Sequence, residues 1–156
     1  MNDLLEFGKE MKAHSWEIKL WPKTWKEYDG ATSMTWNEVK LVASERPSVP
    51  KEPGLYTLIA KIDVAAHPAN SPLMYVGRTK NLWRRFGEYL HDERVRIRRP
   101  LVYRLLNQCG EYIWFYYTTC PDSETRLGER RFHLAFMPPC NSELPGVLGQ
   151  ATKAFP

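Results

Sequence analysis

Two short segments that combine tyrosine and glycine, followed by an arginine and a glutamate, are the part of this chain that could do chemistry. They are Gly54–Tyr56 and Tyr75–Gly77, then Arg85, then Glu129, with Asn141 twelve positions later. One carboxylate, one arginine and two tyrosines are sufficient to cut a phosphodiester with a single metal ion. No other part of the sequence proposes a chemistry.

Glu129 is expected on a helix that Pro121 opens and Pro138 ends. On such a helix Glu129 shares one face with two phenylalanines and His133. A carboxylate among aromatic rings is unfavourable unless something pairs with it, and a divalent cation or an arginine of the basic segment described below could do so.

An exposed glutamate that pairs with Arg126 or Arg130 is the alternative for Glu129. The glycine before it, Gly128, favours the functional interpretation. A glycine inside a helix costs roughly 1 kcal/mol relative to alanine, so we expect another backbone or a substrate to approach closely there. His133 could orient the waters of a metal and His91 could assist as a base, although both are more simply ordinary histidines.

Positive charge is concentrated in one segment of the chain. The formal net charge is +4, yet residues 1–50 hold seven Lys/Arg against eight Asp/Glu, so the excess lies after residue 50. Residues 78–100 alone hold eight basic against three acidic residues. A solvated helix face is the ordinary meaning of such a run, but arginine predominates, which suits bidentate phosphate contacts. Besides Arg85, the predicted nucleic-acid contacts are Arg78, Lys80, Arg84, Arg94, Arg96, Arg98 and Arg99.

The periodicity around the tyrosines predicts a hairpin and a helix. Residues 55–62 and 73–77 are rich in strand formers and are separated by a long Pro-containing loop. Asn81 can cap a helix that runs to about Leu90. Arg85 falls outside the apolar stripe of that helix, which includes Tyr89, and is therefore expected to face outward.

The following segment predicts one more helix and the central strand. Apolar spacing indicates a helix over residues 100–107 that Gly110 ends. Residues 111–119 form a continuous aromatic run, which fits the buried centre of a small sheet.

The first 50 residues are expected to be an extension packed on the domain. Residues 3–13 have the spacing of a short amphipathic helix, and residues 35–42 fit a short helix or strand. Four tryptophans, Trp16, Trp21, Trp25 and Trp36, follow the first of these segments and could stack on bases, although such aromatics more often attach an extension to its domain. We predict an extension at 1–50, a domain at 51–145 and a tail at 146–156.

Composition limits the class of protein. The three cysteines form no C-x-x-C pair and are odd in number, which favours buried thiols of a reducing compartment over a zinc knuckle. No stretch of about 20 apolar residues occurs. The expected location is cytoplasmic, without membrane contact.

Taken together, the motifs resemble the GIY-YIG domain of the repair incision nuclease and of related homing and restriction endonucleases. The matching segments are Gly54–Tyr56, Tyr75–Arg85 and Glu129–Asn141, and the resemblance spans about two thirds of the chain. It implies an α+β fold, with a small central antiparallel sheet flanked by helices.

The resemblance also implies a role for each motif residue. Glu129 would ligate a single Mg²⁺ or Mn²⁺, and Arg85 would neutralise charge on the phosphoryl group. Tyr56 would position or activate the attacking water, Tyr75 would support it, and Asn141 would anchor the site by hydrogen bonds. Because a tyrosine has a pKa of about 10, Tyr56 could act as a base only where nearby positive charge favours the phenolate.

Two features depart from many relatives. Arg78 stands where a lysine is frequent, and it can hold a phosphate but cannot take a proton. The connection between the two tripeptides is longer than usual, and its loop at 63–72 is interpreted as a substrate-specific insertion.

Two functions therefore compete. The chain is predicted to be a metal-dependent DNA endonuclease, acting as a monomer or a homodimer, with strandedness undetermined and RNA still open. The alternative is a non-catalytic nucleic-acid-binding module on the same scaffold.

Overall fold

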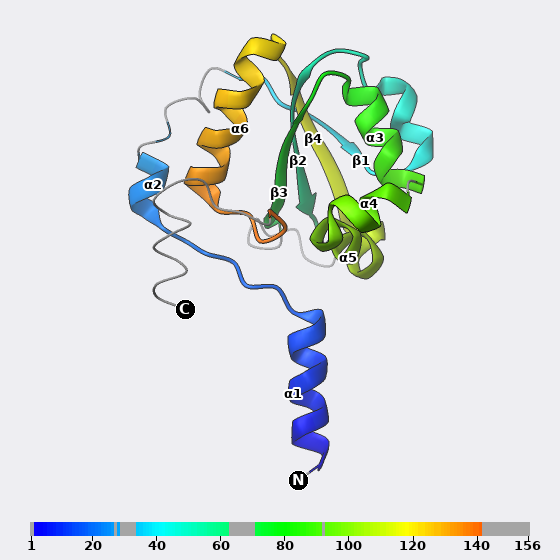
Figure 1. The fold of residues 1–156 in the computed structure, drawn as a ribbon, viewed down its shortest axis with the longest axis vertical. Helices are drawn as coiled ribbons and strands as arrows, with labels where there is room; N and C mark the ends of the chain where they lie inside the picture. Colours follow the sequence, from blue (N-terminus) through cyan, green and yellow to red (C-terminus); the bar gives the residue numbers. More distant parts are fainter. Residues whose placement is uncertain (1, 27, 29–33, 63–70, 92, 142–156) are drawn as a thin grey trace.

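A four-stranded antiparallel sheet with helices on both faces forms the body of the protein (Figure 1). The structure is a computed structural model that describes residues 2–141 apart from 27, 29–33, 63–70 and 92. The strands, in spatial order, are β1 (Asn37–Lys40), β4 (Ile113–Thr119), β2 (Gly54–Ala60) and β3 (Leu73–Thr79). The α-helices are α1 (Asn2–His14), α2 (Pro22–Lys26), α3 (Leu82–His91), α4 (Glu93–Arg98), α5 (Pro100–Cys109) and α6 (Asp122–Phe136). The predicted α+β fold is confirmed.

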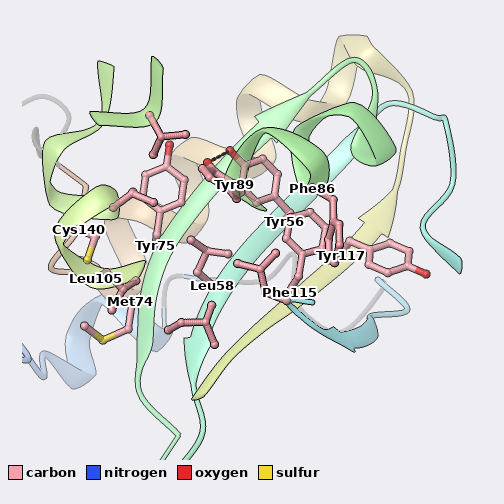
Figure 2. Packing of buried hydrophobic residues seen from close by; sticks show 14 of the residues in the cluster. Tyr56, Leu58, Met74, Tyr75, Phe86, Tyr89, Leu105, Phe115, Tyr117 and Cys140 are labelled. Atoms are coloured by element: carbon pink, nitrogen blue, oxygen red, sulfur yellow. Dashed lines mark hydrogen bonds between the residues drawn. The ribbon is translucent and has the colours of Figure 1, made fainter. Parts of the chain in front are cut away.

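The sheet separates α6 from α3, α4 and α5 (Figure 1). The main core lies between the sheet and the second group of helices, where Tyr56, Phe86 and Phe115 are fully buried (Figure 2). The rings of Tyr56 and Phe115 stack at 5.1 Å between centroids, and Phe86 meets Phe115 edge to face. This aromatic packing fixes β2 against β4 from the helix side.

The aromatic run at 111–119 is the central strand, as predicted. It forms β4 from Ile113 onward and pairs with β2 on one side and β1 on the other. Residues 37–40 of the predicted extension are therefore a strand of the same sheet, and the segment that fitted either a helix or a strand is a strand.

The tryptophan-rich segment contacts the body at several points. The indole N–H of Trp16 donates to Oε1 of Gln108 at 3.0 Å, and the Arg104 guanidinium lies 4.4 Å from the Trp16 ring. Trp36 packs edge to face on Phe132 of α6 at 5.1 Å. These contacts support attachment over base stacking for Trp16 and Trp36. Helix α1 itself projects away from the sheet (Figure 1).

Several local expectations can also be checked. Asn81 caps α3, because its Oδ1 accepts the N–H of Arg84 at 2.8 Å. The three cysteines are free thiols. No helix in the described part of the chain is long and apolar enough to cross a membrane. The predicted tail at 146–156 and most of the 63–72 loop lie outside the described residues.

Candidate active site

The hairpin of β2 and β3 places the two tripeptides side by side. Tyr56 pairs directly with Gly77, and Leu58 pairs with Tyr75. A Cβ at position 77 would overlap the hydroxyl of Tyr56. The glycine that ends the second tripeptide is therefore required because the Tyr56 ring crosses its backbone.

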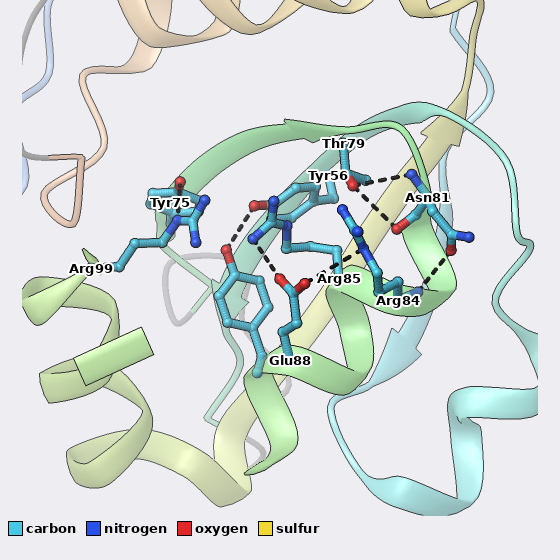
Figure 3. A network of polar contacts seen from close by, with 9 residues as sticks. Tyr56, Tyr75, Thr79, Asn81, Arg84, Arg85, Glu88 and Arg99 are labelled. Carbon is cyan, nitrogen blue, oxygen red and sulfur yellow. Dashed lines mark hydrogen bonds and ion pairs between the residues drawn. The ribbon is translucent and has the colours of Figure 1, made fainter. Parts of the chain in front are cut away.

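The Tyr56 hydroxyl lies in the core and not at the surface. It is fully buried and shares a hydrogen bond of 2.7 Å with the hydroxyl of Tyr89 (Figure 3). Burial raises the pKa of Tyr56 well above its ordinary value, the neighbouring Tyr89 and Tyr75 raise it further, and Arg85 and Arg99 oppose the shift. Tyr56 is therefore a neutral phenol in this arrangement.

Tyr89, which was predicted only as part of the apolar stripe of α3, joins the tyrosine cluster through this hydrogen bond. It is 5% exposed, and burial raises its pKa too. The sequence could have indicated this, because Tyr89 is four residues after Arg85 and residues four apart lie on the same side of a helix.

Arg85 faces inward, so the expected outward orientation is wrong. Its side chain is only 15% exposed, and Nη1 donates to Oε2 of Glu88 at 2.6 Å (Figure 3). A carboxylate three residues later on the same helix makes this burial tolerable for the guanidinium. Its buried Nε has no hydrogen-bond partner among the described residues.

Glu129 is paired with an arginine of the basic segment. Nε of Arg78 on β3 donates to its Oε2 at 3.1 Å, whereas the alternative partners Arg126 and Arg130 form no ion pair with it in the described part of the chain. The Glu129 side chain is 30% exposed. Burial raises the pKa of this carboxyl, and Arg78 opposes that shift.

The close approach that Gly128 predicted is made by a side chain, and not by a substrate or another backbone. A Cβ at this position would come within 2.5 Å of a methyl group of Leu55. Leu55 is fully buried on β2. The glycine therefore allows α6 to pack closely on a core side chain.

Asn141 fastens the chain after α6 to the open edge of β3. Its Oδ1 accepts the N–H of Val76 at 3.0 Å and its Nδ2 donates to the carbonyl of Val76 at 2.9 Å. The N–H of Cys140 donates to the carbonyl of Met74 at 2.9 Å. The side-chain amide thus imitates one residue of a neighbouring strand.

A cavity of about 320 Å³ opens at this edge, and three of the predicted catalytic residues line it together with two of the predicted nucleic-acid contacts. Its polar lining consists of Tyr75, Glu129, Asn141, His133, Arg98 and Arg99. Successive residues of β3 point to opposite faces of the sheet, so Tyr75 and Arg78 lie on opposite faces. Glu129 pairs with Arg78 on its face, and it can therefore meet Tyr75 only at the edge of the sheet. Tyr56 lies behind Tyr75, with 6.0 Å between ring centroids, and Arg85 lies beside Tyr56 (Figure 3).

The predicted nucleic-acid contacts separate into different environments. Arg84 pairs with Glu88 at 3.5 Å and Lys80 with Asp122 at 3.7 Å, and both basic side chains are exposed. Arg96 and Arg98 are exposed on α4, which the sequence had suggested only as a charge run. The side chain of Arg94 lies outside the described part. Arg99 instead donates from Nε to the hydroxyl of Tyr75 at 3.2 Å.

The donor set fits a hard cation that keeps most of its waters. No group of three or more His, Cys, Asp or Glu that could hold a metal exists among the described residues. Glu129 is the carboxylate of the cavity, and the cavity has room for a hydrated ion. His133 lines the same cavity, its pKa is lowered by burial, and its Nε2 is buried without a hydrogen-bond partner within the described structure.

Asn141→Ala is expected to destabilise the protein by about 2 kcal/mol, because two hydrogen bonds to the edge of β3 are lost. Asn141→Asp should also destabilise it, because an ionised carboxylate cannot donate to the Val76 carbonyl. Thermal unfolding measures both effects, with the exposed Asn107→Ala on α5 as the control. Equal melting temperatures for all three variants would show that the two hydrogen bonds from Asn141 to β3 do not stabilise the fold.

Glu129→Gln is expected to raise the melting temperature at neutral pH. The raised pKa of Glu129 means that its ionised form disfavours the folded state. The advantage of the variant should be complete above that raised pKa and should vanish as the pH falls below the ordinary range of a glutamate. Melting curves of both proteins across that pH range test the sign, and a variant that is less stable at neutral pH would contradict it.

The comparisons with known proteins concern the fold. No family model and no curated protein matches this sequence. The chain is similar to solved structures of the GIY-YIG N-terminal endonuclease domain of UvrC from Thermotoga maritima. A Tyr→Phe variant bound to the catalytic divalent cation shares 20% identity over 64% of this chain and 93% of that chain, with a TM-score of 0.46. A magnesium-bound form shares 21% identity over 63% and 92%, with a TM-score of 0.44. At this identity and TM-score the likeness assigns neither an activity nor a site residue to this chain.

Proposed function

We propose that this chain is a metal-dependent DNA endonuclease that hydrolyses phosphodiester bonds in the cavity at the edge of β3. The observation that carries the proposal is the meeting of Tyr75, Glu129 and Asn141 around one cavity. These residues are far apart in sequence and belong to the motifs that resemble the GIY-YIG domain. A module that only binds nucleic acid has no physical need for a desolvated carboxylate there.

Glu129 would hold Mg²⁺ or Mn²⁺ together with water molecules. When bound, such an ion polarises the phosphate and stabilises the leaving oxygen. Arg78 neutralises the carboxylate at 3.1 Å, and this exposed arginine could turn toward a phosphate when a cation binds Glu129.

The tyrosines and Arg85 would then act in two layers. The Tyr75 hydroxyl faces the cavity and is placed to contact substrate or water. Tyr56 and Tyr89 form a buried, neutral pair behind it, so we assign Tyr56 a positioning role in this state and not that of a base. Arg85 does not line the cavity, so its buried Nε, which has no hydrogen-bond partner among the described residues, would bind a phosphate oxygen only if the side chain turns toward the cavity.

Digestion of plasmid, linear duplex, single-stranded and branched DNA tests the proposal. Cleavage is expected with Mg²⁺ or Mn²⁺ and none in EDTA, and mapping of the ends identifies the substrate. If the protein binds these DNAs but leaves all of them intact with either metal, the binding-module alternative is correct.

A further inference from the structure

Arg99 occupies a different place from the other arginines of the basic segment. It lies directly before Pro100, which begins α5, and its backbone is outside the helical region, with φ −140° and ψ 68°. Its side chain is half-buried and reaches the Tyr75 hydroxyl through Nε at 3.2 Å (Figure 3). The same side chain lines the cavity that Glu129 also lines. A position predicted only to contact nucleic acid at the surface is thus inside the candidate site.

Arg99 forms no close ion pair among the described residues, although Glu129 of the same cavity interacts with its charge over a longer distance. Among the described residues Arg78, Arg84 and Arg85 each have an acidic partner within 4.0 Å, whereas Arg99 has none. Burial disfavours its charge, but the surrounding tyrosine hydroxyls raise its pKa, so it stays a cation. A partly desolvated guanidinium without a closely paired anion is unfavourable unless a ligand supplies one.

Within the described part of the chain, the geometry leaves most of the hydrogen-bonding capacity of Arg99 available. A guanidinium has five N–H donors, and Tyr75 uses only the one on Nε. The two terminal nitrogens can bind two oxygens of one phosphate side by side. Tyr75 holds the planar group in place, which reduces the entropy lost on binding.

We propose that Arg99, oriented by Tyr75, is a phosphate-binding residue that holds one backbone phosphate of the bound strand in the cavity beside Glu129. This rests on the proposed function for the identity of the ligand, a phosphodiester of DNA. Arg99 would then be a second arginine at the reacting strand, reached from the cavity, while Arg85 lies deeper and pairs with Glu88.

The test asks whether the Arg99 side chain and one particular phosphate of the DNA depend on each other for binding. A short fluorescein-labelled DNA that the protein binds is made as a series in which a neutral methylphosphonate replaces one phosphate at a time. Affinities are measured by anisotropy in EDTA, so cleavage plays no part. The wild-type chain should lose about tenfold in affinity when the phosphate held by Arg99 is neutralised, the size of a charge-assisted contact.

Arg99→Gln should weaken binding of the unmodified DNA by a similar factor and abolish the effect of the methylphosphonate at that one position only. Arg130→Gln, an exposed arginine on α6, makes the same charge change and should leave the whole profile unchanged. Arg99→Lys keeps the charge without the planar fork and should give an intermediate effect. Where the wild type cuts the same DNA, the coupled phosphate should be the scissile one or its neighbour.

Two outcomes would overturn the proposal. The first is a methylphosphonate profile that is the same in wild type and Arg99→Gln, with only the melting temperature lowered, because Arg99 would then merely fasten α5 to β3. The second is coupling at a phosphate remote from the mapped cut. A protein that shows the coupling but never cuts would reject the nuclease function and keep the phosphate site, so the two failures are distinguishable.

Discussion

Glu129→Gln is expected to reduce metal-dependent cleavage by at least about a thousandfold while leaving DNA binding roughly unchanged. The amide has the same size and can still accept the hydrogen bond from Arg78. What it lacks is the negative charge that would hold a divalent cation against its waters. Initial cleavage rates with Mg²⁺ and with Mn²⁺ measure the loss, and anisotropy in EDTA measures binding.

Glu124→Gln is the matched control, because Glu124 is an exposed glutamate on the same helix. It should cut at the wild-type rate. Unchanged cleavage in Glu129→Gln would show that this carboxylate does not hold the metal. If Glu129→Gln instead lost both its fold and its DNA binding, Glu129 would be a structural residue. The melting temperature separates loss of cleavage in a folded protein, for which a rise is expected, from loss of the fold.

Elements defined by local patterns could be predicted from the sequence. The Asn81 cap, the β4 aromatic run and the helix after Pro121 each depend on residues close together in the chain. The membership of Tyr75 and Glu129 in one site followed from the order of the motifs and not from any local property.

Orientations that depend on distant partners could not be predicted. The apolar stripe of α3 assigned Arg85 to the surface, but Glu88 and the tyrosine hydroxyls let the guanidinium lie inside. Gly128 correctly indicated a close approach, and only the fold shows that Leu55 makes it. The partner of Glu129 also remained open until β3 placed Arg78 next to α6.

The edge position of β3 explains why the site forms where it does. Asn141 and Cys140 occupy part of the open edge with hydrogen bonds that a neighbouring strand would otherwise make. An edge covered by a loop is protected from pairing with another chain, and side chains from both sides of the sheet line the cavity beside it. If the proposed function is correct, Tyr75 from one side and Glu129 from the other would act on the same phosphate, which a central strand would not allow.

Gly54→Ala is expected to destabilise this fold strongly. A Cβ at position 54 would overlap the backbone carbonyl oxygen of Thr118 on β4 and lie 2.9 Å from a methyl of Leu82. The carbonyl cannot move without separating β2 from β4. We expect a loss of about 3 kcal/mol, which lowers the melting temperature by roughly 6–12 °C in a chain of this size.

Cleavage should also fall in Gly54→Ala, because a shift of β2 moves Tyr56 away from Tyr89 and loosens the support of Tyr75. Gly110→Ala is the matched control, since its Cβ would meet nothing within 4 Å and should leave stability nearly unchanged. Gly128→Ala should fall between the two, because the methyl of Leu55 can rotate away and alanine favours the helix by roughly 1 kcal/mol. Thermal unfolding of the three variants gives the order directly. If Gly54→Ala melted with the Gly110→Ala control, the first glycine would have no packing role, and the position of Tyr56 would have to depend on its aromatic neighbours alone.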